Sequence, residues 1–160
     1  MPKPVVFAGS FDPVTNGHVE IIRRAQSIFG SVVVLVMPNA QKTPLFSLQE
    51  RKALLEEVFK KDKHIKVASA TGLLVNYMKK HHLTVLVRGI RNGADLSYEN
   101  TARAYNQWLY PSLETVYLPA TEKFAFVSSS LVKESFSYGA DVRPLLPASV
   151  FSALKRKLIH

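Results

Sequence analysis

The sequence predicts an α/β protein whose single domain is a doubly wound, parallel five-stranded sheet. Five short apolar runs rich in β-branched residues alternate with stretches of helical periodicity, which is the pattern of a parallel sheet covered by helices. No repeat, low-complexity segment or Pro/Gly/Ser-rich linker interrupts the 160 residues, so one domain over residues 1–160 is expected at this length. The pattern does not predict the order of the strands.

The first two strand–helix pairs are indicated by apolar spacing and by residues typical of helix ends. Residues 5–8 form the first expected strand, and the following helix carries these apolar residues on one face: Val19, Ile22, Ala25 and Phe29. Gly30 directly after this face is typical of a helix end. Residues 32–37 are apolar throughout, as expected of a strand buried on both faces. Ser47 followed three residues later by Glu50 forms a capping box that opens the next helix.

The later elements follow the same reasoning. Strands are expected at residues 65–68, 84–87 and 115–118, each a short run rich in apolar and β-branched residues. Helices are expected at residues 73–82 and 95–109, from Ser128 or Ser129 onward, and at residues 148–159. Serine is a preferred N-cap residue, and Pro147 stands at the start of the last helix, where proline is tolerated.

Composition excludes several classes of protein. With 47% hydrophobic and 21% charged residues, the chain resembles folded soluble proteins rather than disordered ones. The longest apolar run, residues 32–37, is far shorter than the roughly 20 residues of a membrane span. The apolar stretch before Asp12 is too brief for a signal peptide, so we expect a cytoplasmic location without membrane contact. The absence of cysteine excludes disulfides, thiolate metal sites and a cysteine nucleophile.

The net charge of +9 suits nucleic acid, an acidic membrane surface or small phosphorylated ligands. The basic clusters lie at residues 60–66, 79–82 and 155–157, near predicted helix ends, where cations complement the helix dipole. Aromatic residues do not alternate with these clusters as base-stacking platforms would, so we expect no nucleic-acid partner. A basic nucleic-acid-binding module is the alternative from another class, and a steep loss of affinity with salt would identify it.

Three segments with unusual residue combinations follow the first, fourth and fifth expected strands: Gly9–His18, Arg88–Arg91 and Thr121–Ser130. In open α/β sheets, ligands bind beyond the carboxyl ends of the strands, where loops meet helix N-termini. We therefore expect these segments, distant in the sequence, to converge at one edge of the sheet. Lys42, in the loop after the second strand, would add a cation at the same edge.

The first of these segments favours a phosphate-binding helix N-terminus. Gly9 allows a sharp turn, and Thr15 or Asn16 can cap the following helix so that His18 lies in its first turn. A helix N-terminus offers free N–H groups and a partial positive charge to a phosphate. A histidine there can donate a hydrogen bond to a phosphoryl oxygen whose charge grows in the transition state. The alternative is that His18 packs at the helix start and Asp12 caps a turn.

The other two segments add cationic and hydroxyl groups. Arg88 and Arg91, at a strand end, can form a fork for phosphate or carboxylate. The alternative is a pair of surface arginines bound to Asp95 and Glu99. The serines Ser128–Ser130 can offer hydroxyl and backbone N–H groups to polyphosphate oxygens, or can serve only as a helix cap.

Absent motifs narrow the choice of chemistry. The chain has no G-x-x-x-x-G-K-[ST], and no G-x-G-x-x-G follows the first strand, which excludes an ordinary P-loop phosphotransferase and a dinucleotide fingerprint. H-E-x-x-H and G-x-S-x-G are absent as well.

Together, Gly9–His18, Arg88–Glu99 and Val127–Glu134 resemble the motifs of the bacterial phosphopantetheine adenylyltransferases, in the Thr/His-x-Gly-His nucleotidyltransferase superfamily. The resemblance runs from Val5 to about Pro147. It implies a Rossmann-like nucleotidyltransferase fold and transfer of the adenylyl group of ATP to phosphopantetheine, which gives dephospho-coenzyme A and pyrophosphate. This reaction is the penultimate step of coenzyme A biosynthesis. The resemblance further implies Mg²⁺ as cofactor, a homohexamer, and coenzyme A as a feedback inhibitor.

The resemblance also implies roles for individual residues. The implied catalytic residues are His18, Ser10, Lys42 and Arg91, with His18 stabilising the transition state. The implied ATP-binding residues are Ser10, Phe11, His18, Gly89, Ile90, Arg91, Glu99, Phe124, Ala125, Phe126, Val127, Ser128, Ser129 and Ser130. The implied phosphopantetheine-binding residues are Ser10, Lys42, Leu74 and Arg88, and no residue is implied as a metal ligand.

Four places depart from the usual family pattern. Ser10 stands where threonine is common and keeps the hydroxyl, and Phe124 stands where tryptophan or tyrosine is common. Asn92-Gly93 replaces small apolar residues, and residues 40–43, which include Lys42, differ from the commoner Ser/Lys-rich form. Two alternatives stay open. One is an adenylyl- or cytidylyltransferase of the same superfamily with another phosphorylated acceptor. The other is a nucleotide-binding regulator that releases no pyrophosphate.

Overall fold

The computed structural model describes residues 2–159 and contains one five-stranded parallel sheet with the order β3-β2-β1-β4-β5. The strands are β1 (Val5–Gly9), β2 (Val32–Val36), β3 (Ile65–Ser69), β4 (Val85–Ile90) and β5 (Glu114–Pro119). The helices are α1 (Asn16–Phe29), α2 (Leu48–Val58), α3 (Leu74–Lys80), α4 (Gly93–Leu109), α5 (Ser129–Ser137) and α6 (Ala148–Leu158). The predicted fold class, a doubly wound parallel sheet, is confirmed.

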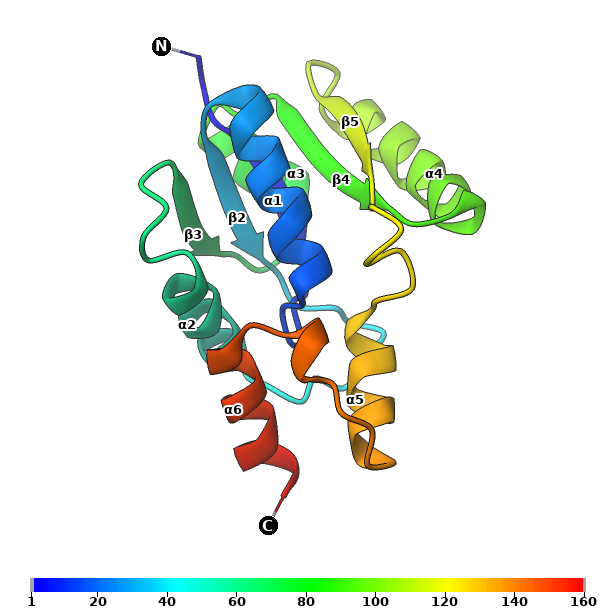
Figure 1. Ribbon diagram of the computed structural model, residues 1–160. Helices are drawn as coiled ribbons and strands as arrows, with labels where there is room; N and C mark the ends of the chain where they lie inside the picture. Colours follow the sequence, from blue (N-terminus) through cyan, green and yellow to red (C-terminus); the bar gives the residue numbers. More distant parts are fainter. Residues whose placement is uncertain (1, 160) are drawn as a thin grey trace.

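The strand order follows a simple path. The chain builds outward from β1 through β2 to β3, then crosses back to place β4 on the other side of β1 and β5 beyond it. The direction of winding therefore reverses between β1 and β4, which is the place where α/β sheets of this kind bind ligands. In Figure 1 the carboxyl end of β2 points toward the lower half of the molecule, where α5 and α6 lie.

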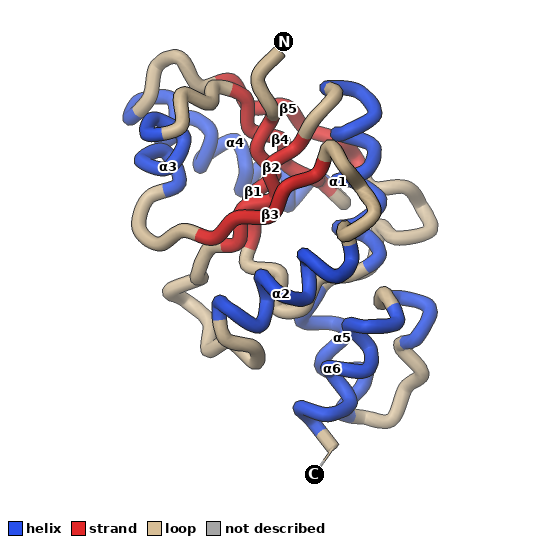
Figure 2. The backbone as a smooth tube through the Cα atoms, turned by 90° about the vertical axis from the view of Figure 1, so that its left-hand side faces the viewer, coloured by secondary structure: helices blue, strands red, loops and turns tan. Residues whose placement is uncertain are grey.

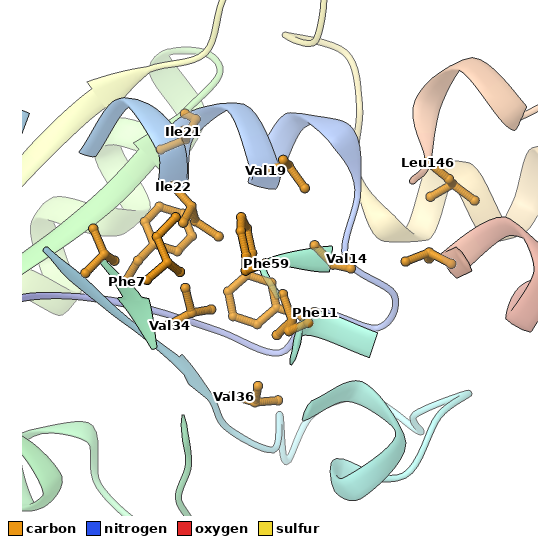
Figure 3. Close-up of a cluster of buried hydrophobic side chains, with 14 of the residues drawn as sticks. Phe7, Phe11, Val14, Val19, Ile21, Ile22, Val34, Val36, Phe59 and Leu146 are labelled. Carbon is orange, nitrogen blue, oxygen red and sulfur yellow. The ribbon is translucent and has the colours of Figure 1, made fainter. Parts of the chain in front are cut away.

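Helices cover both faces of the sheet (Figure 2), with α1 on one side of the strands and α3 on the other. The larger core cluster lies between the sheet and helices α1, α2, α5 and α6, and a smaller one lies against α3. Figure 3 shows Val19, Ile21 and Ile22 of α1 in the larger cluster, near Phe7 and Val34 of the sheet. β1, β2 and β4 contribute buried residues to both clusters and are the three inner strands of the sheet, so they fix the position of the loops at their carboxyl ends.

The bounds of the observed elements lie within two residues of the predicted ones, apart from two larger differences. The strand expected at residues 84–87 extends to Ile90, so Arg88 and Gly89 lie within β4, opposite Tyr117 and Leu118 of β5. A short 3-10 helix over Arg143–Leu145, absent from the sequence prediction, precedes α6. None of the helices within residues 2–159 has the length and apolar character needed to cross a membrane.

Candidate active site

A cavity of about 350 Å³ lies at the carboxyl ends of β1 and β4. The three sequence segments expected to converge do so around it. The predicted site residues that line it are Ser10, Phe11, His18, Lys42, Arg88, Gly89, Arg91, Glu99, Phe124, Val127, Ser128 and Ser129. The cavity therefore joins the β1–α1 loop, the end of β4 and the start of α5, together with one lysine from the β2–α2 loop.

The other predicted site residues do not line this cavity. Leu74 lines a separate cavity of about 130 Å³, whose wall also includes Arg88 and Glu99. Ser130 lines a small recess beside Lys42. The remaining three, Ile90, Ala125 and Phe126, line neither cavity, and the side chain of Phe126 is exposed.

His18 is oriented by the cap of α1. The Thr15 hydroxyl accepts a hydrogen bond from the His18 backbone N–H (3.3 Å), and the Thr15 backbone N–H donates to His18 Nδ1 (3.0 Å). Since Nδ1 accepts, the proton of the neutral ring lies on Nε2, the other ring nitrogen. The ring also meets the edge of Phe11, with 5.1 Å between ring centroids. His18 thus packs at the helix start, as one interpretation of the sequence predicted. It also lines the cavity, as the phosphate-binding interpretation requires.

The electrostatic surroundings keep His18 neutral at physiological pH. Burial, and then the positive charges of Arg91 and Arg88, lower the pKa of His18 from its ordinary value of 6.5 to about 4. A neutral imidazole with its proton on Nε2 is a hydrogen-bond donor to an anionic ligand and requires no change of protonation to act as one.

Both cavity arginines are paired with carboxylates of α4. Arg88 binds Glu99 through two hydrogen bonds of 3.0 and 2.8 Å, and a third bond of 2.8 Å joins Arg88 to the Ala8 carbonyl. Arg91 binds Asp95 at 3.0 and 3.3 Å. The pairing expected as the alternative therefore exists, yet all four side chains also line the cavity. The carboxylates hold the guanidinium groups in place, in the planar two-bond geometry that arginine favours.

The start of α5 is tied to the β1–α1 loop. Ser128 caps the helix by accepting from the backbone N–H of Leu131 (3.1 Å), and the Ser129 hydroxyl donates to the Pro13 carbonyl (2.7 Å). The Lys42 ammonium lies 3.4 Å from the Ser130 hydroxyl. Two helix N-termini, those of α1 and α5, therefore border one cavity, and each adds free N–H groups and a partial positive charge.

Gly89 permits the close packing that shapes this edge. A Cβ atom built on Gly89 would lie 2.9 Å from Cδ1 of Ile21, which is nearer than side-chain atoms tolerate. Glycine at this position of β4 therefore leaves room for the end of the Ile21 side chain of α1.

The described residues do not form a metal cage. No group of three or more His, Cys, Asp or Glu side chains suited to a metal ion occurs within residues 2–159. The two carboxylates of the cavity, Asp95 and Glu99, are each held by an arginine. Within residues 2–159, the side chains therefore do not by themselves form a complete site for a Mg²⁺ ion.

Sequence reasoning missed one face of α4. Arg103 and Asn106 line the smaller cavity together with Glu99. Their spacing from Glu99, four and seven residues, places all three on one side of a helix, and this polar periodicity was the signal available in the sequence. Sequence reasoning also missed Arg51, which is buried although charged.

Comparison with known proteins identifies the family. A family model described as cytidylyltransferase-like matches residues 6–135. A phosphopantetheine adenylyltransferase of Thermotoga neapolitana is 50% identical over 153 residues, which cover 96% of this chain and 95% of the relative. Proteins of the same name from Dictyoglomus turgidum and Alkaliphilus oremlandii are 44% and 41% identical, over 95% and 97% of this chain and 95% and 99% of their own length. The chain belongs to the phosphopantetheine adenylyltransferase family of cytidylyltransferase-like proteins.

Proposed function

We propose that this protein transfers the adenylyl group of ATP to phosphopantetheine, forming dephospho-coenzyme A and pyrophosphate in the penultimate step of coenzyme A biosynthesis. The observation that carries the proposal is the meeting of Gly9–His18, the end of β4 and the start of α5 around one cavity at the switch point of the sheet. The family to which the chain belongs supplies the identity of the two substrates.

The reaction needs no nucleophile from the protein. An oxygen of the phosphopantetheine phosphate attacks the α-phosphorus of ATP, a new phosphoanhydride bond forms, and the bond to the β-phosphate oxygen breaks to release pyrophosphate. The attacking group is already an anion, so the barrier lies in bringing two polyanions together in line. Fixed donors and cations around the cavity suit this task, and no side-chain base is required.

In this proposal His18 is the donor whose contribution grows in the transition state. Its Nε2–H would bind an oxygen of the α-phosphate, where negative charge increases as the new bond forms. The Thr15 contacts support the role because they hold the ring in one orientation and one tautomer before the substrate arrives. Ser10, Lys42 and Arg91 complete the catalytic set as further ligands of the reacting phosphates.

The two neighbouring cavities support a division of substrates. We assign ATP to the larger cavity and the predicted ATP-binding residues that border it, and the pantetheine arm to the smaller cavity that includes Leu74. Arg88 lines both cavities, as expected of a residue that binds the phosphopantetheine phosphate between them. Ser10 and Lys42 would reach the same phosphate from the side of the β2–α2 loop.

Magnesium, assembly, inhibition and location belong to the same proposal. Mg²⁺ would enter bound to the ATP phosphates, because the cavity carboxylates are occupied by arginines. A homohexamer would cover two of the exposed aromatic residues of α4, Tyr105 and Trp108. Coenzyme A contains both an adenylyl group and a pantetheine arm, so it would compete for both cavities. The cytoplasm, where ATP and phosphopantetheine are both present, is the proposed location.

Pyrophosphate release from ATP and Mg²⁺ tests the function directly. We expect release with phosphopantetheine and none with pantetheine, which lacks the attacking phosphate. The His18→Ala variant is the matched control, since it should bind ATP but turn over slowly. Binding of ATP without pyrophosphate release would contradict the assigned acceptor. A screen of other phosphorylated acceptors would then distinguish another transferase of the superfamily from a regulator without turnover.

A further inference from the structure

Three charged residues cluster behind the wall of the larger cavity. Asp12 is 7% exposed and Arg51 3% exposed, and both border a small recess together with Lys133. None of the three lines the larger cavity. Burying charge is costly unless each charge finds partners, so the partners of this cluster indicate what it holds in place.

Asp12 joins three segments of the chain. Its two carboxylate oxygens accept hydrogen bonds from the backbone N–H groups of Phe46 (2.8 Å) and Leu45 (2.9 Å), in the β2–α2 loop. The Lys133 ammonium of α5 adds a third bond at 3.0 Å. Although burial raises the pKa of Asp12, the two N–H groups and Lys133 lower it below its ordinary value. Asp12 is therefore an anion whose lone pairs are used by two other segments, not by its own turn.

Arg51 holds the same loop from the opposite side. Its guanidinium donates to the Ser10 carbonyl (2.8 Å), the Phe46 carbonyl (3.1 Å) and the Met37 carbonyl (3.4 Å). Met37 and Phe46 flank the loop that carries Lys42. Arg51 therefore fixes both ends of this loop and joins them to the backbone of Ser10.

These contacts restrict the position of the loop that carries Lys42. The loop is anchored at residue 37 and at residues 45 and 46, and the residues between them are exposed. The Lys42 ammonium reaches the Ser130 hydroxyl at 3.4 Å, on the same helix that supplies Lys133. The anchors thus set the spacing between the loop, Ser10 and the start of α5, the three elements that contribute cavity residues.

We propose that Asp12, Arg51 and Lys133 form a positioning cluster that places Lys42 and Ser10 for the reacting phosphates. The inference rests on the proposed function. The three residues touch no substrate, and they act through the loop and through the backbone of Ser10. Removing one of them should therefore matter only as long as the residue it positions is present.

A double-mutant cycle tests this dependence. Asp12→Asn keeps the size of the side chain, but its amide nitrogen must face either the Phe46 N–H group or the Leu45 N–H group together with the Lys133 ammonium. We expect kcat/KM for phosphopantetheine to fall by about 10- to 100-fold in Asp12→Asn, the loss typical of a hydrogen bond to a charged group. In the Lys42→Met background the same change should cost at least about threefold less, because the part of the loss that acts through Lys42 is already absent and only the part that acts through Ser10 remains. Equal losses in the two backgrounds would overturn the proposal.

Two further variants keep the test valid if Asp12→Asn does not fold. One is a substitute for it, and the other is a control. Lys133→Met removes one partner of Asp12 and leaves both backbone bonds, so it enters the same cycle if Asp12→Asn fails to fold. Asp62→Asn breaks the surface pair with Arg23 (3.2 Å) and should leave kinetics unchanged. Loss of activity in Asp62→Asn equal to that in Lys133→Met would overturn a specific role for the cluster.

A measurement without turnover separates this inference from the proposed function. Wild-type protein that releases no pyrophosphate with phosphopantetheine would contradict the function alone. Amide hydrogen exchange across residues 37–46 then still tests the cluster. We expect exchange there to be at least about tenfold faster in Lys133→Met and Asp12→Asn than in wild type or Asp62→Asn. Unchanged exchange in this loop would overturn the positioning role.

Discussion

Helices α1 and α4 both follow strands that end at the candidate active-site cavity, yet they are held in different ways. Four residues of α1 are buried in the core: Val19, Ile21, Ile22 and Ala25. No residue of α4 is buried over its length of 17 residues, and the side chains of Tyr98 and Trp108 are 71% and 76% exposed. The two helices therefore differ in packing although their places in the topology are alike.

The two kinds of packing correspond to two different tasks proposed for the site. The N-terminus of α1 carries His18, whose orientation depends on a rigid helix packed against β1 and β4. Helix α4 contributes Glu99 and Asp95. Their carboxylates bind the arginines of the cavity from outside the core. A transition-state donor needs tight placement, whereas ion pairs tolerate small shifts. Changes on α1 should therefore affect kcat and stability, and changes beside α4 should affect binding.

The largest expected effect is that of His18→Ala on turnover. Removing one transition-state donor lowers kcat by roughly 10²–10³, or about 2.7–4 kcal/mol. Affinity for ATP should change far less, because the donor strengthens its bond mainly in the transition state. Steady-state pyrophosphate release and calorimetric ATP titration measure the two quantities. A folded variant with near wild-type kcat would remove His18 from the mechanism.

The next effect is the dependence of stability on pH. Because the pKa of His18 falls from 6.5 to about 4 on folding, the unfolded chain binds more protons than the folded chain between these values. The contribution of neutral His18 to the free energy of unfolding is fully present above pH 6.5 and is lost as the pH falls toward 4. The loss should reach about 2 kcal/mol, less than the full shift implies, because solvent reaches the half-buried ring.

The control for this effect is His18→Asn, which lacks the titrating group. Asp12, Asp95 and Asp141, whose pKa values are lowered in the folded chain, lose their contribution below about pH 4 in both proteins. The difference between the two urea unfolding curves, followed from pH 7 to pH 4, therefore isolates His18. Parallel pH profiles would show that the imidazole is not neutralised by folding.

Much of this architecture could be predicted because its signals are local. The capping box of Ser47 and Glu50, the helix end at Gly30 and the Ser128 cap each depend on residues within one or two turns. The convergence of the three motif segments followed from a general rule about parallel sheets. Local spacing and that rule were sufficient to place His18, Arg88 and the serines at one edge.

The rest depends on contacts between distant residues. The strand order requires β4 to pair with β1 across more than seventy residues, and β4 extends to Ile90 only because β5 pairs with it. Asp12 reads locally as a turn cap, but its partners lie 33, 34 and 121 residues away. No local pattern in the sequence predicts contacts between residues so far apart. Arg51 and Lys133 were therefore given no role in the sequence analysis.

A third effect compares the two substrates beside α4. Arg88→Ala should weaken phosphopantetheine binding by about tenfold to 50-fold, the loss of charge-assisted hydrogen bonds, and should weaken ATP binding less. Glu99→Gln is the matched variant, because it keeps Arg88 but removes the charge of its partner and replaces one of the two oxygens that accept from the guanidinium by an amide nitrogen. Its effect should be smaller in both titrations. Equal weakening of the two substrates by Arg88→Ala would refute the assignment of Arg88 to phosphopantetheine.

The smallest effects come from packing changes made on each helix in turn. Ile22 is fully buried in α1, so Ile22→Val should lower the free energy of unfolding by about 0.5–1.5 kcal/mol. Trp108→Ser on α4 should change it by less than about 0.5 kcal/mol in dilute protein, because the ring is largely exposed within one chain. Urea titrations of both variants measure the difference. A loss in Trp108→Ser as large as that in Ile22→Val at high dilution would contradict the contrast between the helices.

The dependence of Tm on protein concentration gives a second test of the difference between α1 and α4. If subunits of the proposed homohexamer cover α4, wild-type Tm rises with protein concentration because association stabilises the folded chain. Trp108→Ser should weaken that rise, whereas Ile22→Val should lower Tm by a similar amount at every concentration. Light scattering of both variants gives their assembly state under the same conditions. A concentration-dependent Tm that Trp108→Ser leaves intact would move the interface away from the aromatic face of α4, and the exposed helix would then be available to another contact.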